Sequence, residues 1–381
     1  MVAHTVDLNA IALIDNHCHP VLREQQMQPF EFRSYFSEAT HPDFAQRHIS
    51  ESVYYLWLLR QLADFYHCQP VEDEIITVRN SMDTIDLLTR LLQDAGIETL
   101  ILDIGHPDPA LCLSPQEVAA LGVCQCVKML RLETLMQQLV CEYDDFAAVE
   151  YHFMLALTDI REYGYCALKS IVTYRTGLDI QRWSKDEAVR SFHEARAAFS
   201  AQGTLRLAHK PLIDYLLHCA LQSACEQQIP VQFHTGYGDH DTDLRQGNPL
   251  HLRAIFEDVA YQTLQSVLLH ESYPYTRQGA YLAALYPQVY FDLSYMIPFV
   301  DRNEMLAFTR QALSVAPASK LMYSSDGIHV PEMYWASARR VRSVVAQVFQ
   351  EWVQADELDV EHAMRLSQLV LHDTAAELYR L

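Results

Sequence analysis

The sequence is short of basic residues, and this shortage excludes one class of partner. Lys and Arg together number 28 against 49 Asp and Glu, which gives a formal net charge of -21, and the basic residues form no runs. Such a chain has no evident source of attraction to a phosphate backbone. We therefore expect no nucleic-acid partner, and the acidic balance needs no cause beyond solubility.

Glycine is also scarce, at 11 of 381 residues, and the chain contains no Gly/Ser linker, low-complexity tract or internal repeat. No apolar run approaches the roughly 20 residues that span a bilayer. The first residues lack the basic region and apolar stretch of a signal peptide. These absences predict one cytoplasmic domain over residues 1–381, with no membrane partner and with homo-oligomerisation left open.

The nine cysteines form neither a CxxC pair nor a zinc-ribbon spacing, and their number is odd. This pattern indicates neither a disulfide framework nor a structural zinc site. We predict that the cysteines are reduced residues of the core.

What the sequence does contain is an alternation of short apolar runs with longer segments of helical periodicity, which is typical of βαβ units around a parallel sheet. The chain is long enough for a barrel of about 250 residues with insertions. We therefore predict an α/β fold, a (β/α)8 TIM barrel. Its eight strands are expected at residues 10–15, 99–104, 125–130, 167–173, 230–233, 266–269, 289–292 and 321–324.

The gap between the first two runs is much longer than one helix requires. Residues 50–66 carry apolar side chains at helical spacing, and residues 72–92 look similar. We predict a helical insertion over residues 21–95 that caps the first strand–helix loop, although a separate helical lobe would give the same pattern. The gap over residues 180–228 is also helical, with residues 205–221 as its apolar part.

Ligand-type side chains follow several of the apolar runs. His17 and His19 come after the first run, and two residues apart on extended backbone they project to the same side. By the same rule Cys18, between them, points away and is not a ligand. With 18 histidines in the chain, about one His-x-His pair arises by chance. Position, and not spacing, must support a site here.

Three further runs end in the same way, in His234, His270 and Asp326. Because the carboxyl ends of barrel strands converge on one face, the fold would assemble all five side chains there. Each one alone is as readily a core histidine or a capping aspartate, but five in register favour a functional site. Three or four of them can complete a zinc-like coordination shell and leave a position for water.

This ordered set of residues resembles the amidohydrolase superfamily over residues 10–330. A closer resemblance is to the predicted metal-dependent hydrolases related to the amidohydrolase domain that is fused to glutamine synthetase-like domains in some fungal and bacterial proteins. The closer resemblance rests on the long insertion and on four motifs: Tyr35-Phe-Ser-Glu38, Lys169-Ser-Ile-Val-Thr-Tyr-Arg-Thr-Gly-Leu178, His234-Thr-Gly-Tyr-Gly-Asp239 and Ser324-Ser-Asp-Gly327.

The resemblance implies a role for each ligand-type residue. It makes His17, His19 and His234 metal ligands and Asp326 a ligand or the general base. His270 is then either a ligand to a second metal or a residue that polarises the substrate. The nitrogen-rich set favours zinc, with manganese or iron as alternatives, and one metal over two.

Lys169, on the fourth run, leaves alternatives open. Some superfamily members carboxylate a lysine on strand four to bridge two metals, which is what the resemblance implies for Lys169. A buried ammonium is costly unless it is paired, so the lysine is modified, paired with a carboxylate or directed at an anionic substrate. Lys169 sits earlier in its run than the histidines sit in theirs, which disfavours carboxylation.

Arg175 is the candidate for substrate recognition. Its planar guanidinium can hold a substrate carboxylate through two parallel hydrogen bonds, and a surface salt bridge is the alternative. The other residues that follow strand ends and can line the pocket are Tyr174, Tyr237, Asp239, Tyr273 and Tyr295.

The leading hypothesis is hydrolysis of an amide or related carbonyl bond in a small, carboxylate-bearing substrate by metal-activated water. Asp326 would accept the proton from that water and pass it to the leaving group, while His270 stabilises charge on the carbonyl oxygen. Two alternatives stay open. One is a decarboxylase or uronate isomerase-like reaction on the same barrel, and the other is a regulatory barrel that binds metal without catalysis.

Overall fold

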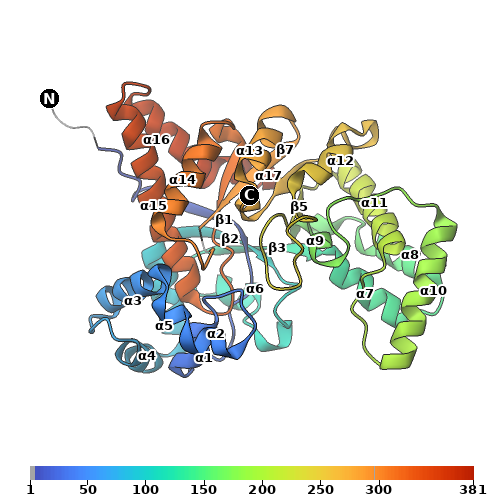
Figure 1. Ribbon diagram of the computed structural model, residues 1–381, viewed down its shortest axis with the longest axis horizontal. Coiled ribbons are helices and arrows are strands. Elements are labelled where there is room, and N and C mark those ends of the chain that lie inside the picture. Colours follow the sequence, from blue (N-terminus) through green and yellow to red (C-terminus); the bar gives the residue numbers. More distant parts are fainter. Residues whose placement is uncertain (1–4, 296) are drawn as a thin grey trace. The chain divides into compact units, whose positions relative to one another are not determined.

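The computed structural model describes residues 5–295 and 297–381. Its eight strands are parallel and form one sheet in chain order, with helices between them (Figure 1). The predicted (β/α)8 fold is therefore confirmed. The strands are β1 (Leu13–Cys18), β2 (Ile97–Asp103), β3 (Gln125–Arg131), β4 (Tyr165–Ser170), β5 (Val231–Phe233), β6 (Ser266–Leu268), β7 (Val289–Ser294) and β8 (Leu321–Ser324).

Helices fill the connections, and the two longest connections hold many of them. The described α-helices are α1 (Pro29–Ser34), α2 (Pro42–Arg47), α3 (Val53–Tyr66), α4 (Glu72–Asn80), α5 (Thr84–Ala95), α6 (Pro115–Ala119), α7 (Leu132–Glu142), α8 (Phe146–Ala156), α9 (Val172–Arg175), α10 (Lys185–Gln202), α11 (Lys210–Gln227), α12 (Arg253–Glu257), α13 (Thr276–Leu285), α14 (Arg302–Leu313), α15 (Pro331–Gln354), α16 (Val360–Gln368) and α17 (Thr374–Tyr379).

Two observed strands differ from the predicted runs in ways that matter for the site. β1 continues through Cys18, so His17 lies inside the strand and not after it. β4 ends at Ser170 because the chain then turns into the short helix α9. Lys169 is thus the penultimate residue of β4, as His17 is of β1. Lys169 therefore matches His17 in position, but it still lies earlier in its strand than His19 and His234, which follow the ends of β1 and β5.

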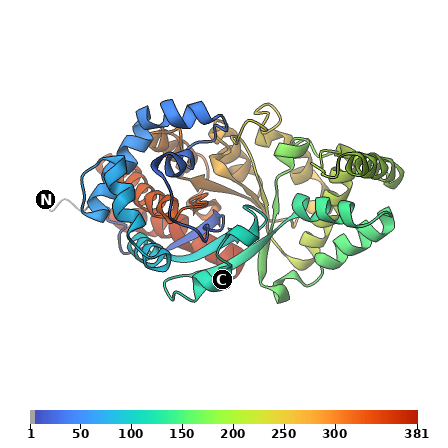
Figure 2. The same cartoon turned by 90° about the horizontal axis from the view of Figure 1, so that it is seen from below.

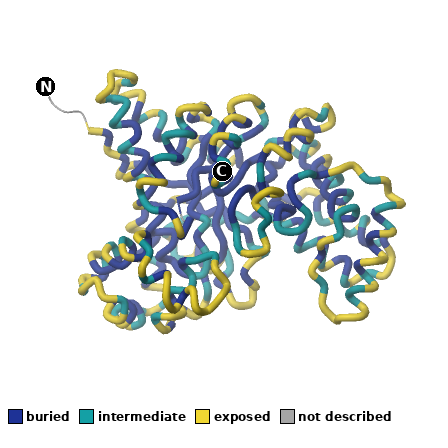
Figure 3. Tube along the Cα trace, viewed as in Figure 1, coloured by how far each residue is buried: buried dark blue, intermediate teal, exposed yellow. Residues whose placement is uncertain are grey.

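The chain divides into two compact units. The first takes the described residues of Met1–Val127, Gly238–His240 and Asp292–Glu377, and the second takes Lys128–Tyr237, Asp241–Phe291 and Leu378–Leu381. Within each unit the strands are mostly buried (Figure 3). The expectation that residues 1–381 form a single domain stays a prediction.

In the first unit, the connection between β1 and β2 is helical, and its helices α3, α4 and α5 lie close together (Figures 1 and 2). The segment predicted as one helical stretch over residues 72–92 is two helices. The second begins where the Asp83 carboxylate accepts a hydrogen bond from the Ile85 amide at 2.9 Å, which caps α5. α5 packs against α15.

A buried ion pair ties the insertion to α15. Arg79 of α4 is 1 % exposed and its Nε donates to Glu332 Oε1 at 2.5 Å. The Tyr66 hydroxyl of α3 donates to the same carboxylate at 2.8 Å, and Arg79 Nη2 donates to Gln25 Oε1 at 2.5 Å. These contacts favour a cap over a separate helical lobe.

In the second unit, the connection between β4 and β5 is helical, as predicted for residues 180–228. α10 begins at a capping box in which Ser184 and Glu187 each bond the other's backbone amide. It ends at Gly203, whose φ of 73° is accessible to glycine without strain. α7, α8, α10 and α11 pack together as one group (Figure 2).

All nine cysteines lie in the described residues and none is disulfide-bonded. Only Cys18, Cys112 and Cys166 are buried, and the other six are partly exposed. The prediction that the cysteines are core residues was therefore wrong for most of them. The six partly exposed cysteines lie on helices (Cys141, Cys219 and Cys225), on β3 (Cys126) and in the loops beside α3 and β3 (Cys68 and Cys124). Among the described residues, no helix has the length and apolar character needed to cross a membrane.

Candidate metal centre

The ends of β1 and β8 bring three ligand-type side chains together in the first unit. The two chain segments are hydrogen-bonded past the ends of the strands: the Asp326 amide donates to the His17 carbonyl at 3.0 Å, and the His19 amide donates to the Gly327 carbonyl at 2.8 Å. Asp326 has a φ of 52°, in the left-handed region. Backbone pairing thus fixes where the side chains of His17, His19 and Asp326 begin.

The three side chains converge on one point. His17 Nε2 and His19 Nε2 each lie 3.5 Å from Asp326 Oδ1, and the ligand atoms of the three residues lie within 4.8 Å of one another. Two ligands about 2.1 Å from a zinc ion at a tetrahedral angle are about 3.4 Å apart. The observed spacing therefore fits a metal ion between them.

The tautomer of His19 is also suited to metal binding. Its Nδ1 lies 3.0 Å from the His106 carbonyl oxygen. Because a carbonyl can only accept, Nδ1 carries the hydrogen, and Nε2 in the neutral ring presents its lone pair toward Asp326. A metal-bound imidazole commonly donates its other N–H to a carbonyl or carboxylate, which fixes the ring. Among the described residues, His17, His19 and Asp326 make up the one group of three or more with ligand geometry.

Two acidic residues, Glu38 and Asp239, lie near this group. Sequence analysis missed Glu38 as a site residue. Burial, followed by the charges of Asp326 and Asp239, raises the pKa of Glu38 to about 7. The hydroxyl of Thr40 lies 3.4 Å from Nδ1 of His240, so the segment after α1 meets residues 238–240. Glu38 belongs to a motif already noted in the sequence, but its distance along the chain from the strand ends gave no sign of a role.

His329 also belongs to the surroundings of His19 and was not predicted. Burial, and next the charge of His19, lower the pKa of His329 to about 4. Its ring contacts Tyr35, with centroids 4.7 Å apart, and His106, with centroids 6.4 Å apart. The insertion therefore reaches the residues around the metal group through Tyr35.

In the second unit, the ends of β5 and β6 carry a cluster of rings. The His234 and His270 centroids are 4.3 Å apart, Tyr174 lies 4.4 Å from His234, and Tyr237 lies 5.8 Å from His270. His234 Nε2 lies 2.7 Å from the Tyr237 carbonyl. Since only the nitrogen can donate, Nδ1 holds the lone pair of the neutral ring. His234 and His270 are therefore brought together as predicted, with two tyrosines around them.

Arg175, at the end of α9, is a partly buried cation. Burial, and next the charge of Arg206, lower its pKa. Its Nε is buried without a hydrogen-bond partner among the described residues. No ion pair of Arg175 is seen in the described part of the chain, so the surface salt bridge considered for it is disfavoured. A guanidinium of this kind is suited to a carboxylate.

Lys169 is 1 % exposed and lies opposite Arg131 of β3 and Gln232 of β5 in the sheet register.

Glu133, which bonds the two residues after Lys169, was missed by sequence analysis. Its fully buried carboxylate accepts hydrogen bonds from Ser170 Oγ at 2.7 Å and from the Ile171 amide at 2.8 Å. Burial raises the pKa of Glu133. The residue follows β3, as His234 follows β5, and that position was the available signal.

Tyr295 and Cys18 lie at the ends of β7 and β1. Tyr295 is fully buried and its hydroxyl bonds Thr309 Oγ1 at 2.8 Å, with the Phe308 ring 6.1 Å away. This position favours packing over the contact with substrate that was expected of it. Cys18 Sγ lies 3.5 Å from the Ile101 carbonyl on β2 and is outside the ligand group, in line with the alternation of side chains along a strand.

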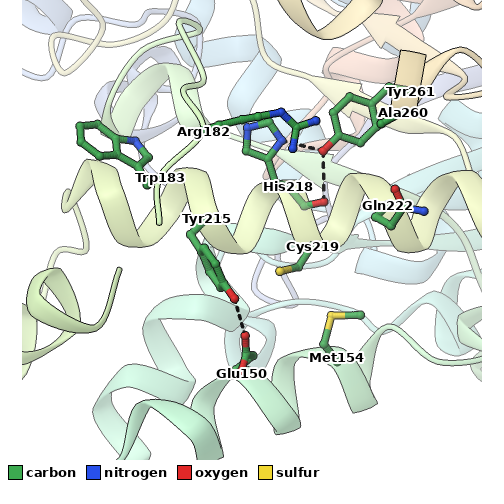
Figure 4. Close-up of a pocket in the computed structure, with 10 residues that line it drawn as sticks. All are labelled: Glu150, Met154, Arg182, Trp183, Tyr215, His218, Cys219, Gln222, Ala260 and Tyr261. Atoms are coloured by element: carbon green, nitrogen blue, oxygen red, sulfur yellow. Dashed lines mark hydrogen bonds between the residues drawn. The ribbon is translucent and has the colours of Figure 1, made fainter. Parts of the chain in front are cut away.

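A pocket of about 480 Å³ lies elsewhere in the second unit, between α8, α11, the segment before α10 and the turn Val259–Tyr261 (Figure 4). Two of its charged side chains are paired. Tyr215 donates to Glu150 Oε1 at 2.6 Å, and Arg182 donates to Asp258 Oδ2 at 2.6 Å. Among the residues that the structure describes, its walls supply no group of three metal ligands, so His17, His19 and Asp326 remain the candidate site.

Known proteins resemble this chain over all or much of its length. A family model described as Amidohydrolase matches residues 181–381, just over half of the chain. Protein fluG of Emericella nidulans is 29 % identical over 401 aligned residues, which cover 97 % of this chain and 46 % of fluG. The chain thus spans about half the length of that curated relative.

Solved structures with the same fold cover almost the whole chain. One is a candidate metal-dependent hydrolase from Lactobacillus casei, with a TM-score of 0.87, 27 % identity and coverage of 99 % of this chain and 98 % of the other. Another is a uronate isomerase from Thermotoga maritima, with a TM-score of 0.67, 14 % identity and coverage of 97 % and 95 %. At that identity the isomerase supports the fold alone.

Proposed function

Because the chain belongs to the amidohydrolase family, we propose that it is a metal-dependent hydrolase that cleaves an amide or related carbonyl bond in a small, carboxylate-bearing substrate. The observation that carries the proposal is the convergence of His17, His19 and Asp326, whose ligand atoms lie within 4.8 Å of one another. Two imidazoles and a carboxylate on rigid strand ends are a donor set for a divalent ion with an open position. The Lactobacillus casei relative, described as a candidate metal-dependent hydrolase, supports the same chemistry.

In the proposed reaction, the residues around the metal site have different roles. His17 and His19 hold the ion, which supplies Lewis-acid chemistry by activating water near neutral pH and polarising a carbonyl group. The Asp326 carboxylate accepts the proton of the attacking water and returns it to the leaving group. The carbonyl of His106 keeps the proton of His19 on Nδ1, so that Nε2 stays available as a ligand.

Residues of the second unit complete the proposal through the fold rule that active sites of such barrels lie at the carboxyl ends of the strands. His234 is the remaining ligand, and His270 stabilises charge on the carbonyl oxygen or binds a second metal. Arg175 holds the substrate carboxylate, and Tyr174 and Tyr237 contact the substrate.

Zinc is the proposed ion, with manganese or iron as alternatives, and one metal is favoured over two. Carboxylation of Lys169 would convert the site to a two-metal centre. Lys169 is the penultimate residue of β4, as His17 is of β1, whereas His19 and His234 follow their strands, so strand position alone does not decide whether Lys169 is carboxylated. The mass of the intact chain under native conditions rises by one carbon dioxide when the lysine is carboxylated. This measurement distinguishes a carboxylated Lys169 from an unmodified one.

The experiment that tests the proposed reaction is a substrate screen with product mass analysis. Zinc-loaded protein is incubated with a library of amides that carry a carboxylate, and hydrolysis is expected to add the mass of one water across the two products. Release of carbon dioxide, or a product of unchanged mass, would point to a decarboxylase or to a uronate isomerase-like reaction. Absence of turnover across the library would favour a regulatory barrel that binds metal without catalysis.

A further inference from the structure

The turn that follows β6 holds an unusual run of backbone conformations. His270, Glu271 and Ser272 have φ values of 61°, 58° and 46°, and none of them is glycine. Non-glycine residues enter this left-handed region uncommonly and singly, and they persist there only when the surroundings hold them. All three are also buried. Something outside the turn must therefore keep His270 where it is.

Thr235, which follows His234 at the end of β5, supplies the contact. Its hydroxyl lies 2.6 Å from the Leu269 carbonyl and 2.7 Å from Ser272 Oγ. A hydroxyl has one hydrogen and a carbonyl can only accept, so Thr235 donates to Leu269 and accepts from Ser272. The Ser272 amide donates to the same Leu269 carbonyl at 3.1 Å. The threonine thus bonds both ends of the turn that contains His270.

The next residue, Gly236, lets the two strand ends approach this closely. A Cβ atom at Gly236 would lie 2.4 Å from the Ser272 carbonyl carbon and 2.4 Å from the Tyr273 carbonyl oxygen. Its φ is 75°, which a glycine adopts freely. The Leu269 amide also donates to the Phe233 carbonyl at 3.0 Å. Backbone contacts and the two hydroxyls therefore join one histidine-bearing segment to the other.

We propose that Thr235 and Ser272 are positioning residues that set the relative placement of the His234 and His270 imidazoles. The two ring centroids are 4.3 Å apart, and each histidine lies within two residues of one of the bonded hydroxyls. The importance of this placement for catalysis rests on the proposed function, in which His234 is a metal ligand and His270 stabilises charge on the carbonyl oxygen or binds a second metal. The placement itself is a property of the metal-free chain and is tested there.

The test compares Thr235→Val, which replaces the hydroxyl by a methyl group of similar size, with Thr235→Ser, which keeps the hydroxyl. Ser272→Ala removes the other half of the pair and serves as the alternative if Thr235→Val does not fold. Ser367→Ala is the matched control, because Ser367 is equally buried and its hydroxyl donates to the Ala363 carbonyl at 2.8 Å inside the first unit.

Two readouts are taken on the full chain. The first is the set of imidazole nitrogen resonances of the metal-free protein, assigned with His234→Gln and His270→Gln. The second is the affinity for zinc alone, measured by competition with a chelator. We expect Thr235→Val and Ser272→Ala to shift the resonances of both His234 and His270 and to weaken zinc binding about 10–100-fold. Thr235→Ser should restore both quantities, and Ser367→Ala should change neither.

The possible outcomes distinguish the positioning role of Thr235 and Ser272 from the proposed role of His234 in the metal centre. If Thr235→Val and Ser272→Ala leave both sets of resonances unchanged, the positioning role is overturned, whatever zinc does. If the resonances shift and Thr235→Ser restores them while zinc affinity stays constant, the positioning role stands and the proposed part of His234 in the metal centre is lost. A general shift of resonances across the chain in Thr235→Val that Thr235→Ser does not reverse would mean an unspecific structural effect and would reject the proposal.

Discussion

His19 Nε2 lies 3.5 Å from Asp326 Oδ1, although the two residues come from opposite ends of the sequence. The pairing of their backbones past β1 and β8 makes this approach independent of any bound ion, because the His19 amide and the Gly327 carbonyl are hydrogen-bonded at 2.8 Å. The ligand group is therefore largely preformed by the fold, and its members can be tested one at a time.

The first prediction concerns Asp326. Asp326→Asn keeps the size of the side chain and one oxygen, but an amide cannot accept the proton of an attacking water. We expect zinc binding to persist and turnover to fall about 100- to 10,000-fold. The measurement is kcat together with the zinc content of the same preparation. Asp359→Asn, at the N-cap of α16 where Asn also caps well, is the control, and full activity of Asp326→Asn would remove Asp326 from the role of general base.

The second prediction concerns metal content. His17→Ala removes a ligand nitrogen that is fully buried, and the space left cannot offer a replacement donor. Zinc per chain, measured by atomic emission after dialysis, should fall from about one to near zero. His251→Ala, at an exposed histidine outside the ligand group, should retain the metal. Retention of zinc by His17→Ala would move the metal centre elsewhere in the chain.

The third prediction uses two glycines with almost the same backbone. Gly236→Ala forces a Cβ to within 2.4 Å of the backbone of Ser272 and Tyr273, at a φ of 75°. Gly203→Ala meets nothing within 4 Å at a φ of 73°. The control should lose about 1 kcal/mol of unfolding free energy, and Gly236→Ala should lose about 3 kcal/mol or more. Urea unfolding measures both, and equal losses would show that the close approach carries no cost.

The fourth prediction concerns the pH dependence of stability in the metal-free protein. The pKa of His329 is lowered to about 4 by burial and by His19, below the ordinary value of 6.5 that it has in the unfolded chain. As pH falls from 6.5 toward 4, the unfolded chain takes up a proton that the folded chain does not, so stability is lost in this window and levels off below it.

For His329 the loss should amount to about 2 kcal/mol, allowing for its partial exposure. Chemical unfolding at a series of pH values compares the wild type with His329→Gln, which should show a shallower slope between pH 6.5 and 4. His193→Gln, at an exposed position, should match the wild type. An unchanged slope in His329→Gln would assign the pH dependence to other groups.

The fifth prediction tests the anchor of the insertion. Arg79→Met leaves the Glu332 carboxylate fully buried without its guanidinium partner, which costs about 3–5 kcal/mol. The double variant Arg79→Met/Glu332→Met replaces both charges by apolar groups and should regain most of this loss. Unfolding free energies of Arg79→Met, Glu332→Met and the double variant give the coupling between the two residues. If Arg79→Met alone cost less than about 1 kcal/mol, the ion pair would not be an anchor.

The positions of His17, His19 and Asp326 could be predicted from the sequence because one rule places them: a ligand-type residue after a short apolar run, at the end of a parallel strand. The same rule brings His234 and His270 to neighbouring strand ends, where their rings meet. Periodicity could locate the strands but not end them, since the end of β4 depends on the turn into α9 and not on the hydrophobicity of residues 171–173.

Other residues depend on contacts that no local pattern records. Glu38 is brought near Asp326 by a segment of the insertion, through the meeting of Thr40 with His240. Tyr295 follows β7 directly, yet it packs on Phe308 and Thr309 of α14. Whether a tyrosine at a strand end faces a pocket or the core is decided by the helix packed against it, which the sequence of the strand does not contain.

The buried pair of Arg79 and Glu332 also limits how this chain can be recombined. Loops at the ends of barrel strands are the parts that vary most readily between enzymes of different specificity, and the insertion would be the natural segment to exchange. A transplant of residues 21–95 alone would carry away the arginine and leave its glutamate unpaired inside α15. A viable chimaera must take the insertion and the start of α15 from the same parent. These two segments, far apart in the sequence, have to be exchanged together.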